Sequence, residues 1–204
     1  MTTAVLVSVF SAALALGSLG ISLYTLWLTK FHRGRLCMTR PTMVCMIREQ
    51  PSNRPKIFLR SLLYSTSARG WVVESMYVRM HQRDWSYVFD IWGYGEAEKL
   101  SLGSGLFVSQ TGAPYNHHFN LARTEREFTW WDGDYRIEVF ANLVGMKGAQ
   151  RLADIKFNLP SEHMGEVLNF RDAAMYFEWD ATATEYRCHV ERLGPTGQLA
   201  LAAR

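Results

Sequence analysis

The feature that most constrains this chain is its uncharged N-terminus. Residues 1–29 contain no Asp, Glu, Lys or Arg, although the 204-residue chain carries 22 basic and 19 acidic residues. The apolar run from Ala4 to Leu28 is long enough to cross a bilayer, because a helix rises about 1.5 Å per residue and the hydrocarbon core is about 30 Å thick. We therefore predict a transmembrane anchor over residues 1–29. Its expected boundary residues are two aromatic side chains suited to the headgroup region and three basic side chains that follow the span: Tyr24, Trp27, Lys30, Arg33 and Arg35.

The flanks of this segment favour an uncleaved signal-anchor over a cleaved signal peptide. A signal peptide has basic residues before an apolar core of about 7–15 residues. Here no Lys or Arg precedes the run, and the run is longer than such a core. Because basic residues near a span stay on the cytoplasmic side, we expect a single-pass protein of the cell membrane with its N-terminus outside and residues 30–204 in the cytoplasm. A domain that faces the periplasm is the remaining alternative.

Small residues follow one face of the apolar segment, at intervals of three and four residues. Such a face lets two helices approach closely in lipid, so a homo-oligomer formed through this helix is one interpretation. The other is that an anchor of this type is simply rich in small residues. The residues concerned are Ser11, Ala15, Ser18 and Ser22, with Ala13 and Gly17 as a further pair.

The rest of the chain reads mainly as β structure. About ten short strands, spaced at 8–12 residues with turn residues between them, favour a sandwich or a barrel. One short helix is expected near 161–170, with Ser161 as its N-terminal cap. The expected strands are 42–47, 56–65, 71–80, 85–92, 106–109, 117–121, 127–131, 135–144, 151–159, 175–179 and 186–190.

These patterns divide the chain into four parts. The anchor over 1–29 is followed by a basic juxtamembrane linker over 30–40, which is short enough to hold the domain close to the bilayer. A β-sandwich domain is expected over 41–193. The tail over 194–204, rich in Gly, Ala and Leu, is expected to be flexible.

One local motif sharpens the fold prediction. The run from Asp132 to Val139 (DGDYRIEV) resembles the start of strand F in immunoglobulin-like domains. The resemblance implies that Tyr135, after the turn at Asp132, forms a structural corner by hydrogen bonding back to the chain. The second cysteine of that family would fall at Ile137, so the inter-sheet disulfide is absent. The implied fold is an Ig-like β-sandwich, which carries no function with it.

The adjacent histidines His117 and His118 are the candidate metal-binding residues. On a strand they point to opposite faces, so one of them at most enters a given site. A metal site would need other histidines or a carboxylate to converge on it, and the chain has no compact ligand motif. The favoured interpretation is that these are structural sheet residues. We therefore predict no cofactor and leave the catalytic residues unassigned.

The pair Trp130 and Trp131 is a candidate contact for a partner. On a strand one ring packs inward and its neighbour faces outward, and an outward Trp is favoured at protein interfaces. Contact with a membrane face and shielding by a loop are the alternative interpretations.

Charge is unevenly distributed beyond the anchor. The stretch 30–60 holds eight basic residues and one acid, whereas 61–204 holds 14 basic residues and 18 acids, so the net charge of +3 is a poor guide to partners. The first stretch is expected to lie beside anionic lipid headgroups. Nucleic acid is not an expected partner, because the domain is not strongly basic.

Together these features predict a membrane-anchored β-sandwich. It would act as a non-catalytic interaction, adaptor or sensing module that binds a protein partner at the membrane surface. The alternative is a membrane-tethered enzyme with a histidine-centred pocket around His117 and His118. Convergence of two histidines and an acid would distinguish the enzyme from the interaction module.

Overall fold

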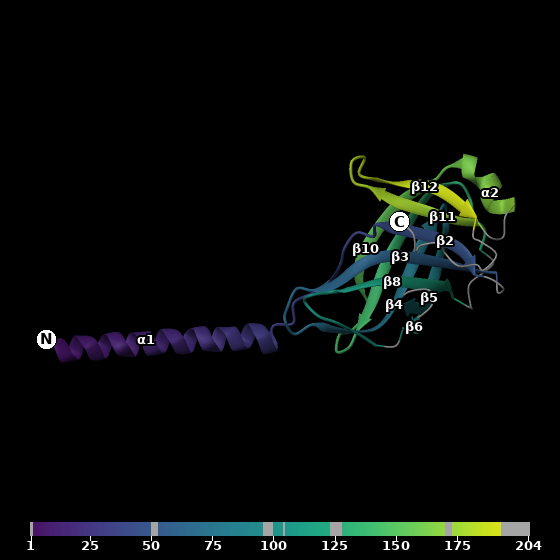
Figure 1. Cartoon of the computed structure of the whole chain (residues 1–204). Helices are drawn as coiled ribbons and strands as arrows, with labels where there is room; N and C mark the ends of the chain where they lie inside the picture. Colours follow the sequence, from purple (N-terminus) through teal and green to yellow (C-terminus); the bar gives the residue numbers. More distant parts are fainter. Residues whose placement is uncertain are drawn as a thin grey trace.

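In the computed structural model, a long N-terminal helix leads directly into a β domain (Figure 1). The structure describes residues 2–49, 53–95, 100–103, 105–122, 128–169 and 173–192. The expected tail 194–204 lies outside these residues. The helices are α1 (Thr3–Leu26), its π-helical continuation η1 (Trp27–Phe31), the 3₁₀ turn η2 (Ser161–His163) and α2 (Met164–Asn169).

Most of the expected strands are present, and the short helix near 161–170 is confirmed as η2 and α2. The expected cap is wrong, because Pro160 stands at the cap position and Ser161 is the first residue of η2. Residues 128–131 are not a strand, and Glu127 lies outside the described residues. Two short strands, β1 and β6, were not predicted. The strands are β1 (Leu36–Met38), β2 (Met43–Glu49), β3 (Arg54–Ser65), β4 (Trp71–Gln82), β5 (Trp85–Tyr94), β6 (Ser101–Leu102), β7 (Leu106–Val108), β8 (Ala113–Leu121), β9 (Gly133–Leu143), β10 (Gln150–Leu159), β11 (Ala173–Asp180) and β12 (Glu185–Arg192).

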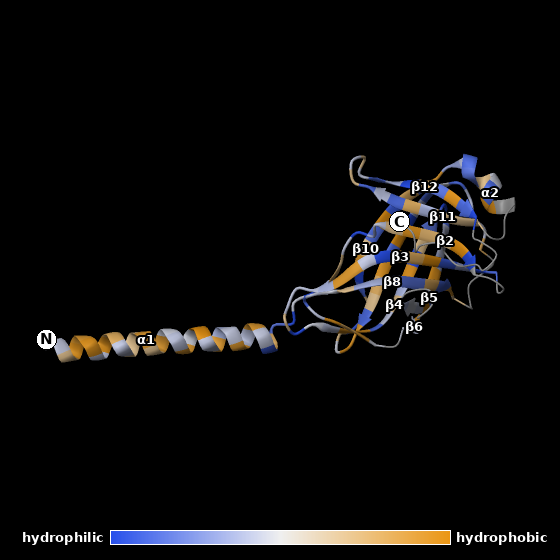
Figure 2. Ribbon diagram, in the orientation of Figure 1, coloured by the Kyte–Doolittle hydropathy of each residue, from blue (hydrophilic) through white to orange (hydrophobic). Residues whose placement is uncertain are grey.

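Helix α1 and η1 project away from the domain, and none of their residues is buried (Figures 1 and 2). Five of their hydroxyl groups donate to the carbonyl four residues earlier, an arrangement that an apolar surrounding favours. The helix has the length and composition of a signal anchor or a signal sequence. The hydroxyls concerned belong to Ser8, Ser18, Ser22, Thr25 and Thr29.

The strands form one antiparallel sheet rather than the two sheets of the expected Ig-like sandwich. Nine strands follow a single hydrogen-bonded path, β10-β9-β4-β5-β8-β3-β2-β11-β12, and β1, β6 and β7 pair at its flank. The sheet curls until its edge strands β10 and β12 come close without pairing, which gives a nearly closed barrel. Its strands are long, with 12 residues each in β3 and β4, and irregularities in β4, β5 and β10 increase the local bend.

Alternation along the strands fills the interior of this barrel with apolar side chains. Val44, Leu59 and His117 are neighbours in register on β2, β3 and β8, and all three are fully buried. A second buried apolar cluster lies on the opposite face of the same sheet region, and its members are Met43, Cys45, Ile47, Phe58, Ala174 and Tyr176.

The hydrogen bond implied by the motif around Tyr135 is present although the two-sheet topology is not. The Tyr135 hydroxyl donates to the Trp131 carbonyl at 2.7 Å and accepts from the Trp131 amide at 3.1 Å. The Gln82 side chain donates to the same hydroxyl. Burial raises the pKa of Tyr135, so the hydroxyl stays protonated. This corner fixes the turn that precedes β9.

The segment 30–40 is bound to the barrel along much of its length rather than acting only as a linker. Strand β1 pairs with β3, from Leu36 opposite Ser65 to Met38 opposite Leu63. Before it, the Arg35 amide donates to Thr66 Oγ1 at 2.8 Å, and Ser67 Oγ donates to the Arg33 carbonyl at 2.6 Å. The barrel therefore begins directly after the helix.

The basic residues of 30–60 do not all gather beside the helix, as had been expected. Strand β2 runs away from the helix end of the barrel, and β3 starts at the far end, where Arg54 lies opposite Glu49. Nearness in sequence is therefore not nearness in space. The basic residues carried away from the helix end are Arg48, Arg54 and Lys56.

Candidate ligand-binding groove at the seam of the sheet

The incomplete closure of the barrel leaves a groove at the seam between its edge strands. Farther from the helix, Phe157 of β10 and Tyr186 of β12 close the seam, with ring centroids 6.4 Å apart. Nearer the helix, β10 faces the segment that joins β1 to β2, and an open groove of about 530 Å³ remains. That volume is in the range of ligand-binding sites.

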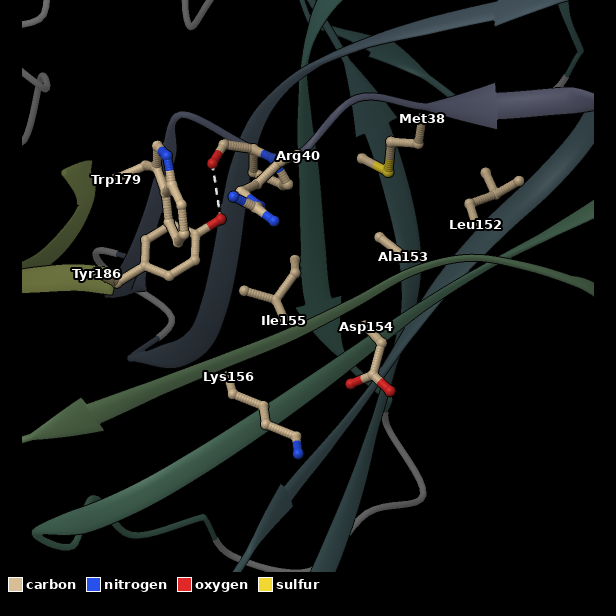
Figure 3. Close-up of a pocket in the computed structure, with 10 residues that line it drawn as sticks. Met38, Arg40, Leu152, Ala153, Asp154, Ile155, Lys156, Trp179 and Tyr186 are labelled. Atoms are coloured by element: carbon tan, nitrogen blue, oxygen red, sulfur yellow. Dashed lines mark hydrogen bonds between the residues drawn. The ribbon is translucent and has the colours of Figure 1, made fainter. Parts of the chain in front are cut away.

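The floor of this groove is aliphatic and continuous with the barrel core (Figure 3). Met38, Leu152 and Ala153 are partly buried and pack against the core, and Ile155 beside them is buried. A ligand that enters the groove can therefore bury apolar groups against a preformed surface.

The end of the groove is built around Arg40 and two aromatic rings. The Arg40 guanidinium lies 3.9 Å from the ring centroid of Trp179, which is a cation–π contact. The Tyr186 hydroxyl donates to the Pro41 carbonyl at 2.7 Å, shown as the dashed line in Figure 3. The contact with Trp179 places the exposed Arg40 side chain at the end of the groove.

Among the described residues that line the groove, the one carboxylate is already neutralised, so the lining carries net positive charge. Arg136 binds Asp154 through two hydrogen bonds of 2.9 and 2.6 Å, and this pairing holds the pKa of Asp154 below its usual value. Within the described residues, neither Arg40 nor Lys156 forms an ion pair. Both cations are therefore available to an anionic ligand.

A charged network behind β10 supports this arrangement. Glu138 of β9 accepts from Arg151 at 2.9 Å and lies 3.3 Å from Arg136, and His81 lies 3.1 Å from its other oxygen. These contacts, led by the hydrogen bond from Arg151, lower the pKa of Glu138. The two arginines are matched by Glu138 and Asp154, so the network adds little net charge to the groove.

The edge of β10 that faces the seam has no neighbouring strand hydrogen-bonded to it among the described residues. This strand pairs with β9 on one side only, and across the described residues no backbone hydrogen bond joins it to β1 or β12. Residues 152–156 thus present backbone donors and acceptors along the groove. An unpaired edge is a ready template for another extended chain.

The two candidate metal-binding histidines lie on opposite faces of β8, as expected. His117 is fully buried inside the barrel, where its Nδ1 accepts from Trp92 Nε1 at 3.4 Å. Burial lowers the pKa of His117 to about 3, so the ring is neutral. His118 on the outer face has Nε2 3.2 Å from the Gly95 carbonyl, and its ring packs edge-on against Phe58 at 4.8 Å.

These histidines do not share a site. Across the described ranges no three His, Cys, Asp or Glu side chains converge in a way that could hold a metal ion. His81 and His189 lie elsewhere on the sheet, beside Glu138 and Tyr176.

Of the two tryptophans, Trp130 is buried and Trp131 is exposed. Trp130 is 3% exposed and packs against Phe128 at 4.4 Å, whereas Trp131 is 45% exposed. The Arg83 guanidinium covers the Trp131 ring at 4.9 Å. Trp131 is therefore the member of the pair that a partner can reach.

The expected boundary residues of the anchor lie at the helix end. The rings of Tyr24 and Trp27 stack 6.3 Å apart, and Lys30 is in the π-helical turn. Arg33 reaches the barrel through a 3.5 Å hydrogen bond to the Gly145 carbonyl, and Arg35 binds it through its backbone.

Sequence reasoning missed the groove residues Arg40 and Lys156. They are far apart in the chain, and they meet only because the sheet curls until β10 faces the segment after β1. No protein-family model matches the chain, and no curated protein or solved structure is significantly similar to it.

Proposed function

We propose that this protein is a single-pass membrane-anchored, non-catalytic interaction module whose seam groove binds an extended acidic segment of a protein partner. The observation that carries this proposal is the unpaired edge of β10 beside two cations that have no ion-pair partner among the described residues. An added strand gives main-chain hydrogen bonds to the edge, while side-chain pockets give specificity.

A peptide suits this groove better than an apolar small molecule. An acyl chain would cover the backbone groups of residues 152–156 without hydrogen bonding to them, and buried unpaired polar groups are costly. An extended peptide would satisfy these groups. Its alternating side chains would place apolar groups on the aliphatic floor and carboxylates near Arg40 and Lys156.

The alternative of a histidine-centred enzyme gains no support from the geometry. That function needs two histidines and an acid in one cleft, whereas His117 and His118 face opposite sides of β8. His117 is also neutral and enclosed by the core, so a solvent-borne substrate does not reach it.

We propose that the domain lies in the cytoplasm with the N-terminus outside, because Lys30, Arg33 and Arg35 directly follow the span. A reporter fused after Arg204 should be active only on the cytoplasmic side, and the intact mass of the membrane-bound chain should include residues 1–29. Reporter activity on the outer side would refute the orientation, and loss of the first residues would identify a cleaved signal sequence.

Binding of a defined peptide tests the groove. We expect the full chain in detergent micelles to bind a short alternating Glu/Val peptide more tightly than its Lys/Val counterpart. Arg40→Glu and Lys156→Glu should each weaken the first affinity about two- to tenfold, because each reversal removes one exposed ion pair and adds repulsion. Fluorescence anisotropy of a labelled peptide measures this.

Two controls isolate charge at the groove and strand addition. Arg54→Glu reverses an exposed cation at the far end of β3 and should leave the affinity unchanged. A Glu/Val peptide with alternate backbone amides methylated should bind at least about tenfold more weakly, because it loses main-chain hydrogen bonds. Equal binding of the methylated and unmethylated peptides would rule out strand addition.

A further inference from the structure

Distant parts of the chain meet at the end of the barrel that faces the helix (Figure 1), and they carry basic residues. Four segments meet there. They are residues 30–38, residues 64–73 with the β3–β4 turn, residues 105–115 with β7 and the turn before β8, and residues 142–150 with the β9–β10 turn. These segments contain no Asp or Glu. We call this end the base, and its five cations are Lys30, Arg33, Arg35, Arg69 and Lys147.

The base is attached closely to the helix, so its position relative to a bilayer is limited. Helix η1 ends at Phe31, and Arg33 already contacts the Gly145 carbonyl at 3.5 Å. The positive φ of Gly34 (61°) turns the chain onto the barrel, where an added Cβ would lie 2.6 Å from Thr66 Oγ1. When α1 spans a bilayer, the base therefore lies at the headgroup layer.

A groove of about 660 Å³ opens in the base between the chain after the helix and the β9–β10 turn. Its lining includes the three cations Arg33, Arg35 and Lys147. No carboxylate lines it, and across the described residues none of these three forms an ion pair. An anion that enters the groove would be the first countercharge to this cluster.

Trp71, which lines the same groove, carries a hydrogen-bond donor on its indole ring. Trp71 is 7% exposed and lines the groove, and the Arg33 guanidinium lies 5.9 Å from the centroid of its ring. Its indole Nε1 is buried and has no hydrogen-bond partner among the described residues. Indole can only donate, so the position favours a ligand that supplies acceptor oxygens.

Exposed apolar side chains lie next to this groove. Val72 and Phe107 are partners across β4 and β7, and the Val144 amide donates to the Val72 carbonyl at 3.0 Å. Met146 lies in the same turn as Val144 and also lines the groove. Their exposed fractions are 41% for Val72, 59% for Phe107, 54% for Val144 and 46% for Met146.

We propose that the base docks on the membrane surface and that its groove holds the phosphate headgroup of an anionic phospholipid. The three cations and the indole N–H supply charge and donors for phosphate oxygens, while the apolar side chains enter the interface beside it. The inference rests on the proposed function only in requiring α1 to span the bilayer. Docking at the base would present the seam groove at a fixed height above the lipid.

Hydroxyl-radical footprinting of the full chain in vesicles tests this proposal. We expect oxidation of Met146 and Phe107 to be slower in vesicles that contain phosphatidylglycerol than in vesicles of phosphatidylcholine alone. Trp85 and Trp131, which are 51% and 45% exposed near the other end of the barrel, serve as internal references. Their oxidation should not depend on the lipid.

Matched charge reversals identify the groove as the cause. In phosphatidylglycerol vesicles, some chains are protected from oxidation at Met146 and Phe107 and others are not. Arg35→Glu and Lys147→Glu should each reduce the ratio of protected to unprotected chains about fivefold. Arg54→Glu, which reverses a cation far from the base, should leave protection unchanged.

Each remaining outcome counts against the proposal. Equal oxidation of Met146 and Phe107 in both vesicles, or protection that survives both reversals, would overturn the headgroup site. Protection produced by inorganic phosphate with phosphatidylcholine vesicles would show that the groove holds free phosphate instead of lipid. A chain that does not float with the vesicles would refute the anchor, and with it this inference, while the peptide affinity of the seam groove would be unaffected.

Discussion

Replacing Phe157 with alanine should lower the free energy of unfolding by about 3–5 kcal/mol, the loss expected when a large buried aromatic leaves a cavity. Phe157 is 6% exposed and lies where the barrel closes. Its ring centroid is 4.1 Å from that of Phe177, 5.5 Å from that of Tyr135 and 6.4 Å from that of Tyr186. The substitution therefore removes contacts on both sides of the seam.

Urea unfolding of the full chain in detergent, followed by tryptophan fluorescence, measures this loss. Phe140→Ala is the matched control, because Phe140 is half-buried on the outer face of β9 and stacks on Tyr77 at 4.9 Å. We expect it to cost about 1–2 kcal/mol, since less apolar area leaves contact. Equal losses for the two variants would show that Phe157 does not hold the seam closed.

Tyr135→Phe should be the next most damaging change, at about 2–3 kcal/mol. It deletes one hydroxyl, leaves the Trp131 amide without its acceptor and removes one of two donors to the Trp131 carbonyl, which still accepts from the Gln82 side chain at 3.1 Å. It also removes an acceptor from the Gln82 side chain. A buried group left unpaired contributes about 1–3 kcal/mol of this cost.

Thermal unfolding of the full chain, compared with that of Tyr77→Phe, checks this prediction. Tyr77 is half-buried on the outer face of β4, so loss of its hydroxyl should change stability by less than about 0.5 kcal/mol. If both variants unfold at the same temperature, the corner does not stabilise the turn before β9.

The anchor and most strands could be predicted from local patterns. The absence of charge before Lys30 predicts the helix, and alternation over residues such as Tyr135, Ile137 and Val139 predicts β9. The corner at Tyr135 was also predicted, because its hydrogen bond joins residues only four apart. Interactions of short range leave a readable pattern in the chain.

The pairing of the strands could not be predicted in the same way. The step from β5 to β8 and the meeting of β10 with β12 depend on partners far apart in sequence. A single curled sheet and two packed sheets have the same alternation along each strand. The choice between them depends on continuous pairing and bulges, such as the one at residues 151–153.

The same reason explains why the groove and the base were missed. Arg40 and Lys156 are 116 positions apart by residue number and meet only across the seam. Lys147 joins Arg33 and Arg35 at the base, whereas Arg54, closer to them in sequence, lies at the other end of the barrel. A count of charges along the chain therefore does not separate the cations of the base from those at the other end of the barrel.

Amide hydrogen exchange of the membrane-anchored chain tests the central claim most directly. With a saturating Glu/Val peptide, we predict slower exchange within residues 152–156 of β10, because the added strand would protect amides that now face the groove unpaired. Residues 137–139 of β9, already paired on both sides, should exchange at an unchanged rate. Unchanged exchange over 152–156, or protection only elsewhere, would contradict the assignment of the seam as the partner-binding site.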